Sequence, residues 1–295
     1  MQQERRGASP EAIQHHYDVG NDFYRTWLDD SLTYSGAMWE NAHDLEQAQE
    51  RKLDYHANEA RATGAARVLD IGCGWGSMLD RLVSHQGVRH AVGLTLSPEQ
   101  ARWIEDQKRP GIEVRVEGWG DHEPTEPYDA IISIGALEHF ARIDQPVDEK
   151  IDNYRRFFSL CHDWLRPGGY LSVQAIAYGN LLRDDIRGGF VSQEIFPESD
   201  FVRLAELVEG SEFLFEIVRL RNDPEDYGRT CQEWLARLRK NRDAAVAAAG
   251  PDLTDKWEQY LDLSVRGWQL RATNLLRITM RRIDQPRSRE RAARN

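Results

Sequence analysis

The chain has 295 residues, of which 40% are hydrophobic and 29% charged, and its formal net charge at pH 7 is −11. These values describe a globular protein and argue against a nucleic-acid binder, whose affinity comes largely from neutralising phosphates. No apolar run approaches the ~20 residues that span a bilayer, and the cysteines are too scattered for a metal site or a disulfide framework. We therefore expect a cytoplasmic protein that meets a membrane only if its substrate is a lipid.

Strands alternate with helices through the first part of the chain. In chain order, the sequence predicts a strand at 68–71, a helix at 78–83, a strand at 91–94, a helix at 97–108, strands at 112–116 and 128–134, a helix at 151–165 and a strand at 170–176. Such alternation predicts βαβ units and a parallel sheet.

The pattern changes after residue 176. Residues 177–197 are polar and glycine-rich, and they precede a helix at 200–208, a strand at 212–220, helices at 223–249 and 253–271, and a strand at 274–283. We predict a helical N-terminal cap segment over 1–64 and a domain over 65–295 that carries a cap insertion at about 177–270. Seven arginines from Arg277 to Asn295 predict a solvated tail.

A glycine-rich turn after the first strand is a candidate binding site. Asp70 ends that strand, and Gly72, Gly74 and Gly76 follow it. Ligands bind at the carboxyl ends of strands in open α/β sheets, where glycines let the backbone approach them closely. Ser77 stands where a dinucleotide-binding loop has its third glycine, and no Gly-Lys-Ser/Thr follows for a phosphate loop. The acidic turn therefore favours S-adenosylmethionine (SAM), because Asp70 can accept hydrogen bonds from its donors.

Several further segments, taken in order, resemble one family. They are residues 15–23, 32–35, 68–76, 93–97 with Gln100, 133–140 and 194–197. Through them the chain resembles the cyclopropane-fatty-acid synthase and mycolic-acid methyltransferase family of class I SAM-dependent methyltransferases. The resemblance implies an α/β, Rossmann-like fold with a seven-stranded, mostly parallel sheet whose last strand pair is antiparallel. A helical N-terminal segment and a helical cap would cover the active site.

The resemblance also implies which residues bind SAM. Together with Asp70 and Gly76 of the glycine-rich turn, the expected cofactor-binding set is Tyr34, Ser35, Asp70, Gly72, Gly74, Gly76, Thr95, Leu96, Gln100, Trp119 and Ile134. Thr95 and Leu96 replace the acid that many methyltransferases place after the second strand. We therefore expect Thr95 and Gln100 to hold the ribose hydroxyls and Trp119 to stack near the adenine.

The chemistry of methyl transfer to an alkene predicts further residues. The attack leaves a carbocation, which needs a dry pocket, aromatic faces and one base. Glu138 is the predicted base, because it follows a buried strand where desolvation would raise its proton affinity. The aromatic candidates are Tyr17, Phe23, Tyr24, Trp27, Tyr34, Trp39, Trp119, Tyr227 and Trp234. The predicted catalytic set is Glu138, Tyr227, Gln174, Tyr17 and His16.

The resemblance also implies a bicarbonate ion, which acts as base in the cyclopropane synthases. A cysteine, a glutamate, a histidine, a tyrosine and a backbone group hold it there. Glu138, Tyr227 and the backbone of Ile134 match these positions. Gly36 stands at the cysteine position and Gln174 at the histidine position. We expect Gly36 to enlarge the pocket and Glu138 to act as base directly.

Three methyl-transfer reactions stay open. The first is C-methylation of an alkene in an apolar small molecule of specialised metabolism, such as a prenyl diphosphate. Arg25, Arg183 and Arg187 would then contact the diphosphate, and Mg²⁺ would be needed only for such a substrate. The alternative is a cyclopropane synthase or branching methyltransferase on unsaturated fatty acyl chains, and a further alternative is an N- or O-methyltransferase. A non-catalytic binding protein is disfavoured by the intact glycine-rich turn, and the oligomeric state stays open.

Overall fold

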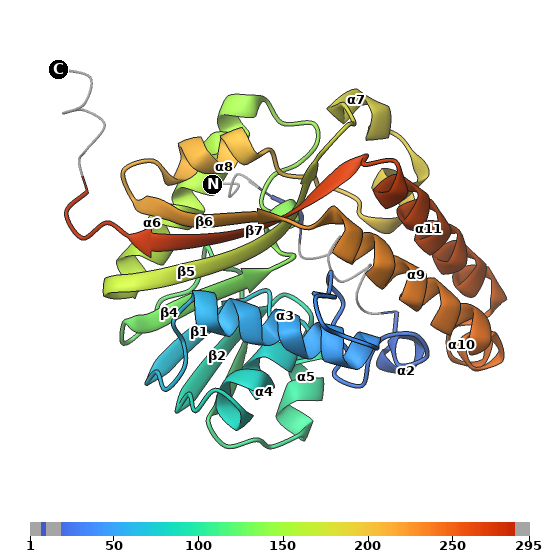
Figure 1. Cartoon of the computed structure of the whole chain (residues 1–295), viewed down its shortest axis with the longest axis horizontal. Coiled ribbons are helices and arrows are strands. Elements are labelled where there is room, and N and C mark those ends of the chain that lie inside the picture. The colour runs from blue at the N-terminus through green and yellow to red at the C-terminus, as the bar shows by residue number, and fades with distance from the viewer. Residues whose placement is uncertain (1–6, 10–18, 287–295) are drawn as a thin grey trace.

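One mixed sheet organises the molecule. The computed structural model describes residues 7–9 and 19–286 (Figure 1). Its seven-stranded sheet has the order β3-β2-β1-β4-β5-β7-β6. The strands are β1 (Arg67–Ile71), β2 (His90–Thr95), β3 (Ile112–Val116), β4 (Tyr128–Ile134), β5 (Leu165–Tyr178), β6 (Phe215–Asn222) and β7 (Thr273–Arg282). β7 alone runs opposite to the other six strands and pairs antiparallel with β5 and β6, so the predicted α/β fold with an antiparallel end is confirmed.

Helices cover both faces of this sheet (Figure 1). On one face lie α3 (Leu45–Glu59), α4 (Ser77–Ser84) and α5 (Pro98–Asp106), and on the other lie α6 (Val147–Trp164) and α8 (Leu204–Ser211). Side chains alternate across a strand, so Val68 packs in the core of the first face and its neighbour Leu69 in the core of the second. The strand order reverses between β1 and β4, and this reversal predicts a ligand site at their carboxyl ends.

A helical layer lies beyond the carboxyl edge of the sheet. It consists of α2 (Asn21–Tyr24), α9 (Pro224–Lys240), α10 (Arg242–Ala249) and α11 (Pro251–Gln269), which share a separate hydrophobic core. Between β5 and α8 the chain forms α7 (Arg183–Ile186) and a single π-helical turn, η2 (Val191–Ile195). Within the described ranges, no helix is both long and apolar enough to cross a membrane.

Several predicted boundaries are wrong. The Arg-Pro-Gly-Gly stretch after α6 belongs to the start of β5, where we predicted a helix-ending turn. This start is irregular: Gly168 adopts φ +74°, and the pairing with β4 changes register between Tyr128 and Ala130. The helix predicted at 223–249 breaks at Asn241 into α9 and α10. Between residues 19 and 44 only the short α2 is helical, so this part of the N-terminal segment is less helical than predicted.

The prediction of a solvated tail from Arg277 onward is also wrong for its first residues. Arg277 lies in β7 and is fully buried, while the strand continues to Arg282. Residues 287–295, which hold the last four of those seven arginines, lie outside the described part of the chain.

Candidate active site

Two adjoining cavities open at the carboxyl edge of the sheet. The first cavity, of about 140 Å³, lies against the glycine-rich turn after β1. The second cavity, of about 90 Å³, lies beyond the ends of β4 and β5. Four residues line both, namely Tyr34, Ser35, Gly135 and His139. A ligand in the first cavity would therefore meet a ligand in the second across this shared wall.

The glycine-rich turn shapes the floor of the first cavity. Gly72, Gly74 and Gly76 all have positive φ, of 79°, 54° and 85°. A Cβ at Gly72 would lie 2.7 Å from Cβ of Ala136, whereas one at Gly74 would meet nothing within 4 Å. Gly72 is therefore required by packing, and Gly74 leaves open space beside a ligand. Gly76 caps α4 and does not line the cavity.

Polar side chains ring the same cavity. Asp70 ends β1 with 2% exposure, and its desolvation raises the pKa of the carboxyl to about 7. Ser97 caps α5 by accepting a hydrogen bond from the backbone nitrogen of Gln100, which places Gln100 beside Thr95. Thr95 Oγ1 then donates to Gln100 Oε1 at 2.7 Å. This geometry gathers the two side chains that we predicted for the ribose.

Apart from Gly76, every residue of the predicted cofactor-binding set lines the first cavity. These residues are Tyr34, Ser35, Asp70, Gly72, Gly74, Thr95, Leu96, Gln100, Trp119 and Ile134. The sequence analysis missed Lys52, Trp75 and Phe140, which line it too. Trp75 could have been found, because it lies between two glycines of the turn. Lys52 could not, because a lysine within a charged helix gives no local signal.

Glu138 lines the second cavity, and its carboxyl group is buried with one oxygen hydrogen-bonded. Its Oε1 accepts a hydrogen bond from the backbone nitrogen of Ile176 at 2.6 Å. Its Oε2 is buried and has no hydrogen-bond partner in the part of the chain that the structure describes. Desolvation raises the pKa of Glu138 to about 7. The group can therefore exchange a proton near neutral pH, as a base needs to do.

His139 is held neutral next to that carboxyl. Burial lowers its pKa to about 4, and Nδ1 lies 2.8 Å from Oγ of Ser199. The remaining wall of the second cavity is mainly apolar. Its hydrophobic residues are Ile143, Ile176, Ile186, Val191, Phe196, Phe201 and Leu275. Such a surface suits a hydrocarbon better than a charged group.

Most of the aromatic candidates are core residues. Phe23, Tyr24, Trp27, Trp39 and Trp234 are buried in the helical layer and line neither cavity. Three others do reach a cavity, with Tyr34 on the shared wall, Trp119 in the first cavity and Tyr227 in the second. Tyr17 and His16 lie outside the described residues.

Gly36 does not enlarge the pocket, contrary to the prediction. A Cβ built on Gly36 would lie 2.8 Å from Cγ of Tyr227 and 3.0 Å from Cδ2 of Leu275. The Tyr227 ring therefore already fills the space that a cysteine side chain would need at position 36. The ring is fixed from its other side by stacking on Trp268, with centroids 4.7 Å apart.

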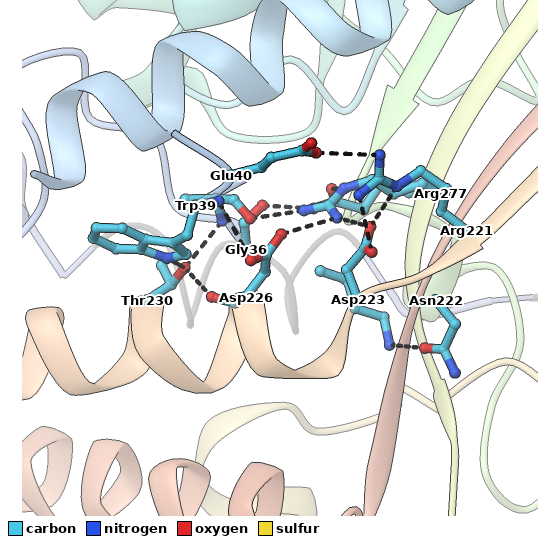
Figure 2. Close-up of polar contacts among 12 residues, drawn as sticks. Gly36, Trp39, Glu40, Arg221, Asn222, Asp223, Asp226, Thr230 and Arg277 are labelled. Atoms are coloured by element: carbon cyan, nitrogen blue, oxygen red, sulfur yellow. Dashed lines mark hydrogen bonds and ion pairs between the residues drawn. The ribbon is translucent and has the colours of Figure 1, made fainter. Parts of the chain in front are cut away.

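Gln174 is likewise committed to its neighbours. Its Nε2 donates to the carbonyl of Gly36 at 3.1 Å, and its Oε1 accepts from Nε of Arg277 at 2.9 Å. Figure 2 shows that Arg277 also reaches Asp223 and Asp226 at the start of α9. Neither position 36 nor position 174 therefore offers a ligand for bicarbonate, and these residues do not fit that ion.

The three arginines predicted to contact a diphosphate line neither cavity. Arg183 forms ion pairs of 2.9 Å with Asp200 and with Glu206, so its charge is already neutralised. Arg25 lies over the ring of Trp103, and Arg187 bonds the carbonyl of Ile143 on the surface. No group of three or more His, Cys, Asp or Glu residues in the described ranges could hold a metal ion. The Mg²⁺ expected for a diphosphate substrate thus finds no support.

Known proteins match the chain along most of its length. A family model described as mycolic acid cyclopropane synthetase matches residues 4–278. A probable fatty acid methyltransferase of Mycobacterium tuberculosis is 32% identical over 281 residues, which are 93% of this chain but only 63% of that protein. Cyclopropane mycolic acid synthase 2 of Mycobacterium leprae is 33% identical over 272 residues, covering 85% of this chain and 87% of that protein.

A solved structure also aligns with nearly the whole chain. The crystal structure of the mycolic acid cyclopropane synthase CmaA1, complexed with SAH and CTAB, superimposes with a TM-score of 0.84 at 28% identity. The alignment covers 94% of this chain and 99% of that one. The fold similarity therefore includes the helical layer as well as the sheet.

Proposed function

The chain belongs to the mycolic acid cyclopropane synthetase family of SAM-dependent methyltransferases, and on this premise we propose that it transfers a methyl group to a double-bond carbon of an unsaturated fatty acyl chain. One observation carries the proposal: a mainly apolar cavity adjoins the first cavity, and the buried Oε2 of Glu138, which lines it, has no hydrogen-bond partner among the described residues. An alkyl chain with a double bond matches that lining. The prenyl diphosphate that we first expected is not supported, because the arginines meant for it are engaged elsewhere.

The first cavity fits SAM. Its open space at Gly74, the acceptor Asp70 and the pair Thr95–Gln100 suit a ligand with an amino-acid end and a ribose. When bound, SAM supplies an electrophilic methyl group on a sulfonium. The shared wall of Tyr34, Ser35, Gly135 and His139 would set the distance between that methyl and the acyl chain.

Glu138 is the proposed base. The π electrons of the alkene form the new C–C bond while the S–CH₃ bond breaks, which leaves a cation on the acyl chain. Oε2 of Glu138 then accepts a proton, and the electrons of that C–H bond form a ring or a new double bond. The apolar wall excludes water that would otherwise trap the cation. Tyr227 lines the same cavity and belongs to this wall.

The test uses SAM with a trideuterated methyl group. The enzyme is offered unsaturated phospholipids, unsaturated acyl thioesters, prenyl diphosphates and simple amines, with and without Mg²⁺, and products are read by mass spectrometry. We expect label only in the acyl substrates, independent of Mg²⁺. Products that keep all three deuterium atoms indicate branching, and products that keep two indicate a ring. Label in the prenyl diphosphates or amines alone would contradict the proposal.

A further inference from the structure

Lys52 is a buried lysine in the wall of the first cavity. It lies on α3 with 1% exposure, and its Nζ donates a hydrogen bond to Oγ of Ser35 at 2.8 Å. One helical turn earlier, Nε2 of Gln49 donates to the carbonyls of Thr33 and Ser35. Gln49 thus ties α3 to the loop at 33–35 by two hydrogen bonds, and Lys52 adds to its own bond with this loop a group that can carry a charge.

Asp70 places the opposite charge in the same cavity. Lys52 and Asp70 form no ion pair with each other in the described structure, yet each influences the titration of the other. Asp29, the other acid within electrostatic reach of Lys52, is already bonded by the backbone nitrogens of Ser31 and Thr33. The third charge nearby, Arg277, is a cation held by Asp223. The cavity therefore holds a buried amine and a buried carboxyl that form no direct ion pair with each other.

Such an arrangement is complementary to a zwitterion. Burying an unpaired charge is costly, and a ligand that brings the opposite charge removes that cost. The amino-acid end of SAM carries an α-ammonium and an α-carboxylate. We infer that Lys52 recognises the α-carboxylate of SAM while Asp70 accepts a hydrogen bond from its α-ammonium.

The second cavity supports this assignment to the cofactor. Neither Lys52 nor Asp70 lines it, so neither is placed to meet the acyl substrate. Burial lowers the pKa of Lys52 to about 7 and raises that of Asp70 to about 7, so both can be neutral in the absence of ligand and charged when a zwitterion arrives. The inference rests on the SAM dependence of the family and not on the proposed acyl substrate.

Binding calorimetry on the full chain, without acyl substrate, tests the inference. Lys52→Met keeps an unbranched side chain, one atom shorter than that of lysine, and removes its charge. The ligands are SAM, S-adenosylhomocysteine, decarboxylated SAM, which lacks the carboxylate, and 5′-methylthioadenosine, which lacks the whole amino-acid end. We expect Lys52→Met to weaken SAM and S-adenosylhomocysteine at least ~30-fold and the other two ligands less than about threefold. Lys240→Met, at the exposed end of α9, is the matched control and should leave all four affinities unchanged.

Two results would overturn the inference. Equal weakening of SAM and 5′-methylthioadenosine would mean that Lys52 acts only by holding the loop at 33–35. Unchanged affinity for all four ligands would remove Lys52 from the site. If Lys52→Met does not fold, the unmodified protein decides the question. It must bind SAM at least ~30-fold more tightly than decarboxylated SAM, and failure to discriminate would overturn the assignment of the carboxylate.

Discussion

Burial changes the protonation of single side chains around the two cavities. Desolvation raises the pKa of the carboxyls of Asp70 and Glu138 and lowers the pKa of Lys52 and His139. Each shift favours the neutral form, as expected for groups removed from water. Asp70, Glu138 and Lys52 therefore change charge near neutral pH, whereas His139 stays neutral there. Of these groups, Glu138 lines the second cavity with an oxygen that has no partner among the described residues.

The proposed base can be tested by removing its charge alone. Glu138→Gln preserves the size of the side chain but cannot accept a proton, so we expect turnover to fall at least ~100-fold. Binding of SAM, measured by calorimetry, should stay unchanged, because Glu138 does not line the first cavity. The control is Glu216→Gln on the exposed edge strand β6, which should turn over normally. Near-normal turnover of Glu138→Gln would exclude it as the base.

The same carboxyl predicts how activity depends on pH. With a pKa of about 7, Glu138 is largely protonated below that pH and cannot accept a proton from the substrate. The turnover rate should therefore rise with pH through about 7 and level off above it. A rate profile that is flat between about pH 5.5 and 8 would contradict the role.

The contribution of Glu138 to the free energy of unfolding should fall as the pH rises, whereas the turnover rate should increase. The folded protein binds the proton of Glu138 more tightly than the unfolded chain does, because its pKa is raised from 4.5 to about 7. The contribution of this group to stability is complete below pH 4.5 and is lost as the pH rises through about 7. In urea titrations, the free energy of unfolding of Glu138→Gln should fall less over this range than that of the unmodified protein.

At the scale of elements, the loop after α2 and the start of α9 are shaped to each other. The Tyr227 ring from α9 occupies the space above Gly36, and Thr230 one turn later accepts hydrogen bonds from the backbone nitrogen of Ala37 and from Nε1 of Trp39 (Figure 2). The position of Tyr227 at the second cavity is therefore decided by a contact between segments far apart in sequence.

A methyl group at position 36 should disturb this contact. Gly36→Ala would place Cβ 2.8 Å from Tyr227, so we expect a loss of about 1–3 kcal/mol in the free energy of unfolding. Gly267→Ala is the control, because a Cβ within α11 meets nothing within 4 Å and alanine favours a helix by about 1 kcal/mol. Chemical denaturation should show opposite signs for the two variants. Equal effects would mean that Tyr227 moves aside at little cost.

At the scale of the whole molecule, Arg277 connects the sheet to the helical layer. From β7 it contacts Gln174 on β5, Asp223 and Asp226 at α9, and the carbonyl of Ala37 in the N-terminal loop (Figure 2). All these contacts are made by a side chain with no exposed surface. The guanidinium is suited to this position because its planar fork can bond several acceptors at once.

Loss of this connection should be costly. Arg277→Met removes a fully buried guanidinium and leaves Asp223 paired with Arg221 alone. Breaking a buried ion pair typically costs about 3–5 kcal/mol of the free energy of unfolding. Arg281→Met, four residues along the same strand, removes only an exposed ion pair with Glu216 and should cost less than about 1 kcal/mol. Thermal unfolding of the two variants measures the difference. A small loss in Arg277→Met would mean that the helical layer docks through its apolar core alone.

The sequence by itself determined the fold class, most strands, the glycine-rich turn and the candidate base. These features rest on local signals, since strand period, turn residues and the end of a buried strand can all be identified within a few positions. The boundary between α6 and β5 escaped this reasoning, because Arg-Pro-Gly-Gly is a turn signal that pairing with β4 overrides. Most of the aromatic candidates line neither cavity, because they belong to the core of the helical layer. In the sequence, an aromatic core cannot be distinguished from an aromatic pocket.

Only the tertiary structure decided what occupies each site. From the sequence we expected Arg183 to contact a diphosphate, but in the fold it forms an ion pair with Asp200. Gly36 implied extra space until Tyr227 was seen to fill it. Lys52 gave no signal until α3 brought it into the cavity of Asp70. In each case the property depends on a partner from a distant segment, and no local pattern specifies which charges and volumes the folded chain brings together.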